Sequence, residues 1–502
     1  MKTSLPAVAI APASVVAAPS ATIPGALAVP TGAAPTSAGS ISGAAAPAAT
    51  GSPWLVFFVA SIAVFLVAID STVLYAAFAA LRRAFPEARA ADLSWVLNAY
   101  TVVYAALLVP SGRLADLYGR KRIFATGVSI FLLASLACGL STHVALLIAA
   151  RVAQAVGAAL LTPASLAIVL AAFPASRRAV VVAAWGAVGG LAAALGPSVG
   201  SWVVDAWGWP WAFFINLPLG ALSLWRGRGA LAESRNPENA APLDIVGVLL
   251  LIGGVGAIAF GLVRIDALGW DSPVVLGCAA AGAALLACFV AWARHAASPA
   301  IDLTLFDSPT YRWVNLATLS FGIAFAMMFF GFFLFMTAVW HFSLPEAGLA
   351  ITPGPLMVVP TAIVSGRIAA RIGHRPLLVV GSVVYACGGL WFRLVPGIAP
   401  DYLHHWLPGL FLTGIGVGMV LPSLSGAAVA QLAPNRFGIG SAVNQAVRQV
   451  GSVLGVAVTI VLVGKTAPQL VDFHHLYDGH VALALLTALL CLRVQTRPRA
   501  PA

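Results

Sequence analysis

The chain has 502 residues, of which 61% are hydrophobic and only 9% are charged, and its formal net charge is +11 at pH 7. Soluble globular proteins have about half apolar and about a quarter charged residues, so this composition excludes an ordinary soluble domain. The basic residues lie between apolar segments and form no patch interleaved with aromatic residues. We therefore expect no nucleic-acid partner and attribute the positive charge to membrane topology.

Residues 1–52 are dominated by Ala, Pro, Ser, Thr and Gly, and Lys2 is their only charged residue. Prolines at this density are incompatible with a helix, so a flexible cytoplasmic tail is expected. A cleavable signal peptide is the alternative, but Pro6, Pro12 and Pro19 interrupt the apolar core that such a signal needs.

Fourteen apolar segments follow, most of them as long as a hydrocarbon layer of ~30 Å requires of a helix. None alternates as a barrel strand would, so an all-α polytopic membrane protein with fourteen transmembrane helices is expected. The segments lie at about 54–81, 94–117, 122–140, 144–173, 179–204, 209–226, 244–263, 272–293, 312–341, 349–371, 376–394, 405–432, 438–463 and 480–495.

The distribution of Lys and Arg among the connecting loops predicts the orientation. With the N-terminus in the cytoplasm, fifteen of these residues fall in inner loops and the C-terminal tail, and six fall in outer loops. Because Lys and Arg favour cytoplasmic loops, we expect both termini inside, in a multi-pass protein of the cell inner membrane.

One basic stretch occurs twice. SGRLADLYGRKR begins at Ser111, and SGRIAARIGHRP begins at Ser365, 254 residues later. The copies follow the second and the tenth segments, whereas duplication of a six-helix half would place them six segments apart. Two helices inserted between the halves remove this discrepancy, and duplicated halves are typical of secondary transporters. The expected regions are a half at 53–228, a linker with two inserted helices at 229–300, a second half at 301–495 and a short tail at 496–502.

The first copy predicts a gating loop. Its glycines permit close helix approach and positive φ, and Asp116 is expected to accept hydrogen bonds from helix N-termini or from Arg side chains across the interface between the halves. A plain positive-inside anchor is the alternative, although it explains neither the acid nor the second copy, where Ala370 stands for Asp116. The loop residues are Gly112, Arg113, Asp116, Gly119, Arg120, Lys121 and Arg122.

Asp70 is the only one of the sixteen acidic residues that we place deep within an apolar segment. Intramembrane acids tend to mark proton or ion pathways, and a proton would compete there with a cationic substrate. A structural Asp that caps or pairs within the bundle is the alternative. Arg151 and Gln154 share a helix face, and Arg151 is expected to lie near Asp70, unless it snorkels to the membrane surface.

Small residues and polar residues mark two further candidate sites. The fifth segment combines a proline kink with small surfaces, which suits either a hinge or ordinary close packing. Its residues are Gly186, Gly190, Gly196, Pro197 and Gly200. Polar residues in other segments are candidates to line a substrate cavity. They are Asn98, Tyr100, Gln154, Asn315, Asn444 and Arg448.

Several of these stretches resemble a known family. GRLADLYGRKR resembles the cytoplasmic signature of the major facilitator superfamily. AIDSTV (68–73), RVAQAVGAA (151–159), GAVGGLAAALGPSVGSW (186–202) and WPWAFFINLPLG (209–220) resemble elements of its fourteen-span drug:proton antiporter family. The chain departs from that pattern at Tyr75, Ala79, Ala155 and Pro210. The resemblance implies a major facilitator fold, a proton-relay role for Arg151, and a hinge and seal between the halves in the fifth segment.

No nucleotide-binding loop, zinc-protease motif, nucleophile elbow or metal-ligand cluster is present in the sequence. We therefore expect a transporter and no enzyme, with no cofactor or metal, driven by a proton gradient. The prediction is export of lipophilic or cationic small molecules by alternating access, with substrate, protons and membrane lipid as partners. Proton-coupled uptake or efflux of a specific metabolite, and a non-transporting sensor on the same fold, are the alternatives. A periplasmic adaptor has no support in the sequence.

Overall fold

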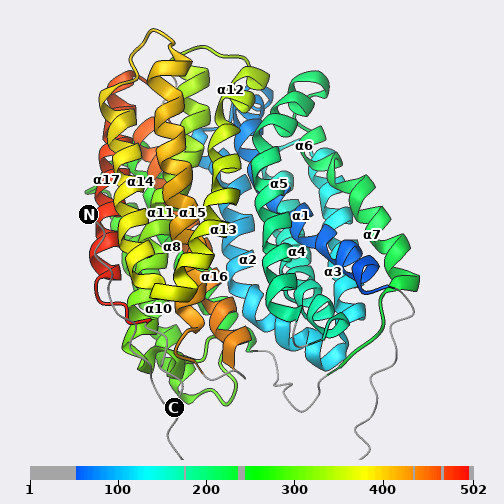
Figure 1. Ribbon diagram of the computed structural model, residues 1–502. Helices are drawn as coiled ribbons and strands as arrows, with labels where there is room; N and C mark the ends of the chain where they lie inside the picture. The colour runs from blue at the N-terminus through cyan, green and yellow to red at the C-terminus, as the bar shows by residue number, and fades with distance from the viewer. Residues whose placement is uncertain (1–51, 175–176, 236–243, 433–435, 465–467, 497–502) are drawn as a thin grey trace, which may run out of the picture. The chain divides into compact units, whose positions relative to one another are not determined.

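The computed structural model describes residues 52–174, 177–235, 244–432, 436–464 and 468–496, except the side chains of residues 178–180, 183, 187 and 266. Every regular element in these residues is helical (Figure 1), which confirms the expected helical architecture. The expected tail at 1–52 lies outside the described residues apart from Ser52, and so does the C-terminal tail apart from Thr496.

The first five apolar segments form helices within a few residues of their expected bounds, whereas the sixth is broken. Pro53 occupies the first turn of α1, where its missing N–H costs no hydrogen bond. The sixth segment forms two helices in place of one, with Ile215 at the break. The elements are α1 (Pro53–Ala84), α2 (Ala90–Tyr118), α3 (Arg120–Gly139), α4 (Val144–Ala172), α5 (Arg178–Trp207), α6 (Trp211–Phe214) and α7 (Asn216–Ala230).

The expected inserted pair forms α8 and α10, which pack against each other. Because α10 exposes large apolar side chains such as Leu276 and Trp292, it presents one of its faces to lipid. The remaining helices are α8 (Ile245–Val263), α9 (Ile265–Leu268), α10 (Pro273–His295), α11 (Pro309–Ala338), α12 (Leu344–Ile351), α13 (Pro353–Ile372), α14 (His374–Leu394), α15 (Leu407–Val429), α16 (Phe437–Val463) and α17 (Leu470–Cys491). A 3-10 turn (Leu303–Asp307) precedes α11, and a π-helical turn (Tyr402–Trp406) precedes α15.

Among the described residues, twelve helical segments are long and apolar enough to cross a membrane. The α6–α7 pair and α17 are not among them. Each half of the pair is short, and the first turns of α17 carry Asp472, Asp478 and three histidines. These polar side chains also explain why the sequence placed the last helix at 480–495, whereas α17 begins at Leu470, where Gln469 and Asp472 form a capping box.

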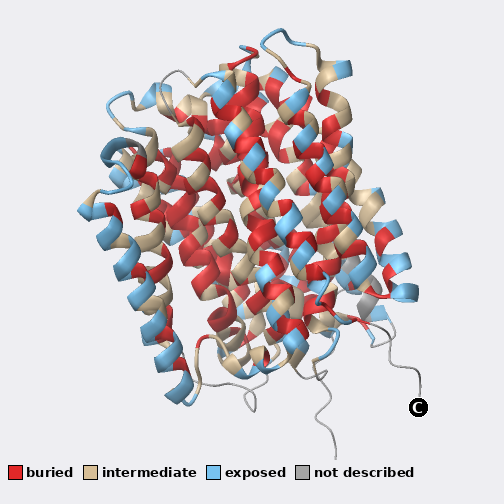
Figure 2. Cartoon of the chain, turned by 90° about the vertical axis from the view of Figure 1, so that its left-hand side faces the viewer, coloured by how far each residue is buried: buried red, intermediate tan, exposed pale blue. Residues whose placement is uncertain are grey.

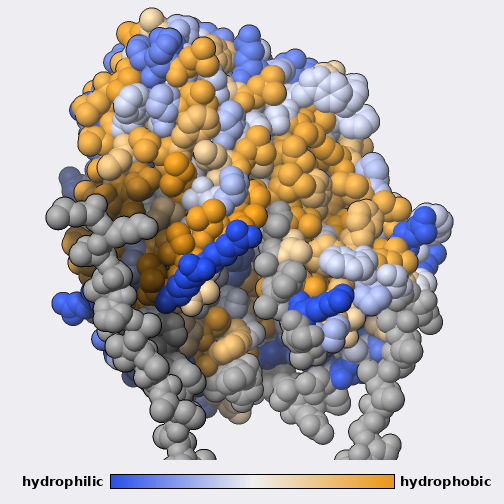
Figure 3. Space-filling view, in the orientation of Figure 1, coloured by the Kyte–Doolittle hydropathy of each residue, from blue (hydrophilic) through white to orange (hydrophobic). Residues whose placement is uncertain are grey.

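Helices of residues 53–230 lie on one side of the bundle and helices of residues 309–491 on the other (Figure 1). Buried residues lie on the inward parts of the helices, and exposed residues lie on the outward parts and at the ends (Figure 2). On one face, hydrophobic side chains occupy the middle of the molecule and hydrophilic ones gather towards its ends (Figure 3). This pattern suits helices that cross an apolar layer.

The two copies of the basic loop have the same local structure. Gly119 joins α2 to α3 with φ +110°, and Gly373, 254 residues later, joins α13 to α14 with φ +83°. Both backbones lie in the left-handed region, which favours glycine because it has no Cβ. The shared conformation supports the duplication inferred from the sequence.

Candidate functional site

Asp70 lies in the middle of α1 and is 2% exposed. Arg151 Nη1 on α4 donates to Asp70 Oδ2 at 2.7 Å, and Gln154 Nε2, one turn further on, donates to Asp70 Oδ1 at 2.8 Å. Asn216 Nδ2, at the start of α7, donates to the same Oδ1 at 2.9 Å. Three donors from two other helices therefore bind both carboxylate oxygens.

Arg151 is enclosed as fully as its partner. It is 1% exposed, and its Nε donates to the carbonyl oxygen of Val96 on α2 at 2.9 Å. Its guanidinium lies 4.0 Å from the centre of the Tyr100 ring, a cation–π contact that is strongest where water is excluded. Arg151 therefore points into the bundle and does not snorkel, and the Tyr100 ring packs against its guanidinium.

A second set of contacts fixes Gln154. Its Nε2 also donates to Ser135 Oγ on α3 at 2.9 Å, and its Oε1 accepts a hydrogen bond from Arg151. Ser135 in turn donates to the carbonyl oxygen of Phe131. The sequence did not single out Ser135 or Asn216. Asn216 had a detectable signal, because it is the only amide in the apolar stretch WAFFINLPLG.

The Asp70 carboxylate is bound through both of its oxygens. Oδ1 accepts from Gln154 and Asn216, and Oδ2 accepts from Arg151, so three of its roughly four acceptor positions are occupied. All three donors lie inside residues 53–230.

The basic loop is bound by residues of its own half and of the linker that follows it. Arg120 Nη2 lies 2.9 Å from Asp116 Oδ1, one helical turn away. Glu233, which follows α7, accepts from the backbone N–H groups of Lys121 and Arg122 at 3.1 and 3.2 Å. A carboxylate at a helix N-terminus satisfies free N–H groups and favours the helix dipole. Glu233, which the sequence missed, caps the helix, whereas the partner of Asp116 among the described residues is Arg120 and lies in the same loop.

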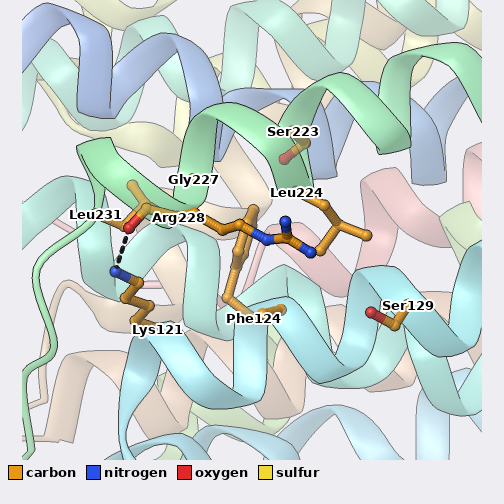
Figure 4. A pocket seen from close by; sticks show the side chains of 9 residues that line it. Lys121, Phe124, Ser129, Ser223, Leu224, Gly227, Arg228 and Leu231 are labelled. Atoms are coloured by element: carbon orange, nitrogen blue, oxygen red, sulfur yellow. Dashed lines mark hydrogen bonds between the residues drawn. The ribbon is translucent and has the colours of Figure 1, made fainter.

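A small pocket lies beside this contact, between α3 and α7, with a volume of about 190 Å³. Figure 4 shows Lys121 Nζ donating to the carbonyl oxygen of Arg228, at 2.8 Å, and the Arg228 side chain extending past Phe124. Arg113, at the end of α2, donates instead to the carbonyl oxygen of Ser298, at 3.2 Å. The loop is thus fastened to α7 and to the segment after α10.

The second copy of the loop repeats the cap with another residue. Thr496 Oγ1, which follows α17, accepts from the N–H groups of His374 and Arg375 at 2.9 and 3.3 Å. His374 stands where the first copy has Arg120, and Ala370 stands for Asp116. The acid and its Arg partner are therefore both absent from the second copy.

The glycine–proline segment of α5 is closely packed against other helices towards its C-terminus and has free space around it towards its N-terminus. Side chains added at Gly196 and Gly200 would strike Thr72 and Val73 of α1. A side chain at Gly348 on α12 would strike the carbonyl oxygen of Pro197 and the side chain of Ser201. Gly186 and Gly190 lie earlier on the same face as Pro197 and Ser201, at helical spacing, yet among the described residues no atom of another helix lies within 4 Å of the Cβ position of either.

The two halves therefore meet at the end of the bundle away from the basic loops, and they also pack together through α2 and α16. Tyr75 of α1 lies 5.5 Å from Phe330 of α11 between ring centres, and Phe78 lies 5.0 Å from the same ring. Phe330 is fully buried, so this part of α11 packs against the other half.

The remaining polar candidates lie in three places. Asn444 donates to Asn315 Oδ1 at 3.1 Å and to Thr318 Oγ1 at 2.8 Å, so these residues join α16 to α11 inside one half. Asn98 is buried and has no hydrogen-bond partner within the described residues. Arg448 of α16 lies near Tyr104 of α2, across the interface between the halves.

Gly112, a glycine of the basic loop, lies near Pro163 of α4.

Comparisons with known proteins agree with this architecture. The family model of the Major Facilitator Superfamily matches residues 60–456. The chain is 34% identical to the multidrug resistance protein Stp of Mycobacterium tuberculosis, over 80% of this chain and 74% of the relative. It is 33% identical to the puromycin resistance protein pur8 of Streptomyces alboniger, over 81% of each chain.

The crystal structure of the human organic anion transporter MFSD10 (TETRAN) matches with a TM-score of 0.60, over 88% of this chain and all of that one. At 16% sequence identity this likeness shows the fold alone. The helical bundle and the family match together define a membrane transporter. The chain belongs to the Major Facilitator Superfamily.

Proposed function

We propose that this protein exports lipophilic small molecules across the cell inner membrane in exchange for protons. The relatives named for multidrug and puromycin resistance support a drug-like cargo. The enclosed Asp70–Arg151 pair is the observation that carries the proton coupling, because intramembrane acids of this kind act in proton relays.

The proposed topology has fourteen spans with both termini in the cytoplasm. The α6–α7 pair and α17 complete the twelve apolar helices, which gives six spans at 53–228, two in the linker at 229–300 and six at 301–495. Gly119 and Gly373, with equivalent backbones at the start of the third helix of each half, support this arrangement. The basic loops then lie on the cytoplasmic side, as the positive-inside rule requires.

The proposed cycle couples a proton on Asp70 to rocking of the halves. Protonation removes the charge that holds Arg151, so contacts among α1, α4 and α7 rearrange. The same α1 helix packs through Thr72 and Val73 against Gly196 and Gly200 of α5, which also contacts α12. A shift at Asp70 can therefore reach the seam where the halves meet. Alternating access by such rocking is general to duplicated transporters.

The state described here corresponds to access from the cytoplasm. The halves touch at the outer end, through Tyr75, Phe330 and Gly348, whereas the α5 face opens at Gly186 and Gly190 towards the inner end. Asp116 is occupied by Arg120 in this state. In the opposite state we propose that Asp116 exchanges this partner for the other half and closes the cytoplasmic side.

Everted membrane vesicles with an imposed proton gradient test the proposal. A panel of lipophilic antibiotics and dyes is added, and a pH-sensitive fluorophore reports proton release. We expect release with the native protein and none with Asp70→Asn. Asp205→Asn is the matched control, because Asp205 is exposed at the end of α5 and has no ion pair within the described residues.

Three results would contradict the proposal. Equal proton release from the native protein and Asp70→Asn would remove Asp70 from the coupling. Cargo accumulation in right-side-out cells, driven by protons, would indicate uptake. Cargo binding without any movement of cargo or protons would indicate a sensor.

A further inference from the structure

Arg448 lies near the middle of α16, at the interface between the halves. There α16 packs against α2 of the other half, with Val453 and Val102 in one buried cluster, and Tyr104 of α2 lies near the Arg448 side chain. Tyr104 is 2% exposed, so Arg448 faces the inside of the bundle and not lipid. Within the described residues, no hydrogen bond or ion pair engages this guanidinium.

Arg448 differs in this respect from Arg151, the other arginine deep in the bundle. Its guanidinium has a carboxylate, a carbonyl oxygen, an amide oxygen and an aromatic ring as partners. The buried carboxylate of Asp70 is paired with Arg151, with 2.7 Å between Oδ2 and Nη1. The other described ion pairs lie at or near helix ends and loops, such as Asp116 with Arg120 and Asp302 with Arg436. Arg448 therefore has no counter-charge from the described part of the chain.

Polar groups of three helices gather at Tyr104. Its hydroxyl donates to Thr162 Oγ1 of α4 at 3.4 Å, and Gln445, one turn before Arg448 on α16, also lies near it. Thr162, Gln445 and Arg448 each keep partial exposure although they lie far from the helix ends. The Arg448 cluster, meaning Tyr104, Thr162, Gln445 and Arg448, thus joins helices of both halves and is partly accessible.

An uncompensated charge at this depth is costly and in membrane proteins tends to mark a binding site or an ion pathway. A guanidinium offers five N–H donors in a planar fork that fits a carboxylate with two parallel hydrogen bonds. It repels a cation at the same place. The geometry points to a binding site for the acidic group of the cargo.

We infer that the exported molecules are lipophilic acids, or zwitterions, whose anionic group binds Arg448. This inference rests on the proposed transport function and narrows its cargo class. Because the cluster spans α2, α4 and α16, an anion bound there contacts both halves and can report its presence to each.

The inference has an electrical consequence. Export of one monovalent anion for one entering proton moves two positive charges inward per cycle. A neutral cargo moves one, and a monovalent cation moves none. An inside-negative potential therefore drives export of the acid most strongly, since each charge that crosses gains free energy from the potential.

Three pyrene probes that differ only at one end test the site: 1-pyrenebutyrate, its primary amide, and a trimethylammonium analogue of the same chain length. Binding to the purified full-length protein is followed by probe fluorescence. We expect the carboxylate to bind at least tenfold more tightly than the amide or the cation. Arg448→Gln should bring the carboxylate within about twofold of the amide, and Arg448→Lys should retain part of the preference.

Arg294→Gln is the matched control, because Arg294 is exposed on α10 and forms no ion pair within the described residues. Native protein that binds the carboxylate no more tightly than the amide, or binds none of the probes, overturns the inference. So does Arg448→Gln if it weakens all three probes equally.

Proton release in everted vesicles distinguishes the proposal of proton-coupled export from the proposal of an anion site at Arg448. Release by the amide or the cation without carboxylate preference leaves proton-coupled export standing and removes the anion site. Carboxylate preference without proton release removes the coupling and leaves the anion site. For the acid, export should also increase with an imposed potential at constant pH gradient.

Discussion

Asp70 and Arg151 depend on each other for their stability inside the bundle. Loss of one member of a buried ion pair leaves the other charge without compensation, at a cost of about 3–5 kcal/mol, whereas loss of both costs less. We expect Asp70→Asn to lower the thermal unfolding temperature markedly, and Asp70→Asn with Arg151→Gln to recover much of that loss. A double-mutant cycle measured in detergent checks this. Strictly additive effects would contradict a direct pair.

Asp302, in the loop before α11, pairs with Arg436, which immediately precedes α16, with 2.6 Å between Oδ2 and Nη2. Partial burial alone would raise the pKa of Asp302, but hydrogen bonds from Thr304 and the nearby Arg436 outweigh it and hold the pKa below its ordinary range. A lowered carboxyl pKa stabilises the fold above the unfolded value, about 4, and this contribution is lost as the pH falls further. We therefore expect Asp302→Asn to lower the unfolding temperature equally at pH 6 and pH 8. A penalty that shrinks between these values would show a titration near neutrality.

Gly119 is constrained by its backbone and by its surroundings. A non-glycine residue at its positive φ costs roughly 1–2 kcal/mol, and a Cβ there would meet the Glu233 carboxylate. We expect Gly119→Ala to destabilise the protein and to loosen the cap on α3, as measured by thermal unfolding. Gly366→Ala is the control, since no atom lies within 4 Å of its Cβ position and alanine favours helix. Equal losses in both variants would contradict the constraint.

For individual residues of the site, the sequence revealed the ionisable side chains and missed several of their hydrogen-bond partners. Asp70, Arg151 and Gln154 stand out because polar groups are rare in apolar segments, and the structure brings them together. Glu233 could not be found in this way. It lies in a charged connection, and only folding carries it to the N-terminus of α3, more than a hundred residues away in the chain.

Among the helices, α5 shows how small residues set close approach on one stretch and free space on another. Gly196 and Gly200 face α1, where added side chains would overlap Thr72 and Val73. Overpacking of this kind costs about 1–3 kcal/mol. We expect Gly200→Leu to reduce both stability and proton-coupled export, and Gly190→Leu to leave stability unchanged. Thermal unfolding and the vesicle assay distinguish these outcomes, and equal loss of stability in both variants would reject the assignment.

Helix prediction succeeded where apolar residues run unbroken and failed where helices carry polar turns. The bounds of α1, α3 and α8 lie within three residues of the expected ones. The start of α17 was misplaced by ten residues, because Asp472, Asp478 and the histidines lower the local hydropathy. The break at Ile215 was also missed, since no residue in WAFFINLPLG marks it.

For the molecule as a whole, the repeat was the most informative pattern in the sequence. It predicted duplicated halves, and Gly119 and Gly373 have matching backbones. It did not predict which ends of the halves touch, because that depends on the state of the transport cycle. The contacts of Gly348 with α5 and the free space at Gly190 describe one such state.

This state predicts opposite responses at the two ends of the bundle. A bulky side chain at Gly348 cannot fit against Pro197 and Ser201, so Gly348→Trp should separate the halves at that end. If the halves rock as rigid units, the end near the basic loops must then close. A cysteine at Gly190, in a background without the native cysteines, reports that closure through its rate of reaction with a membrane-impermeant thiol reagent.

We expect Gly348→Trp to slow labelling of Gly190→Cys severalfold, because the two-state equilibrium moves away from the state open at Gly190. Gly256→Trp on α8 is the matched control, since no atom lies within 4 Å of its Cβ position. It should leave the rate unchanged. An unchanged rate with Gly348→Trp, in protein that still binds cargo, would mean that the two ends move independently. Alternating access would then need local gates in place of rocking halves.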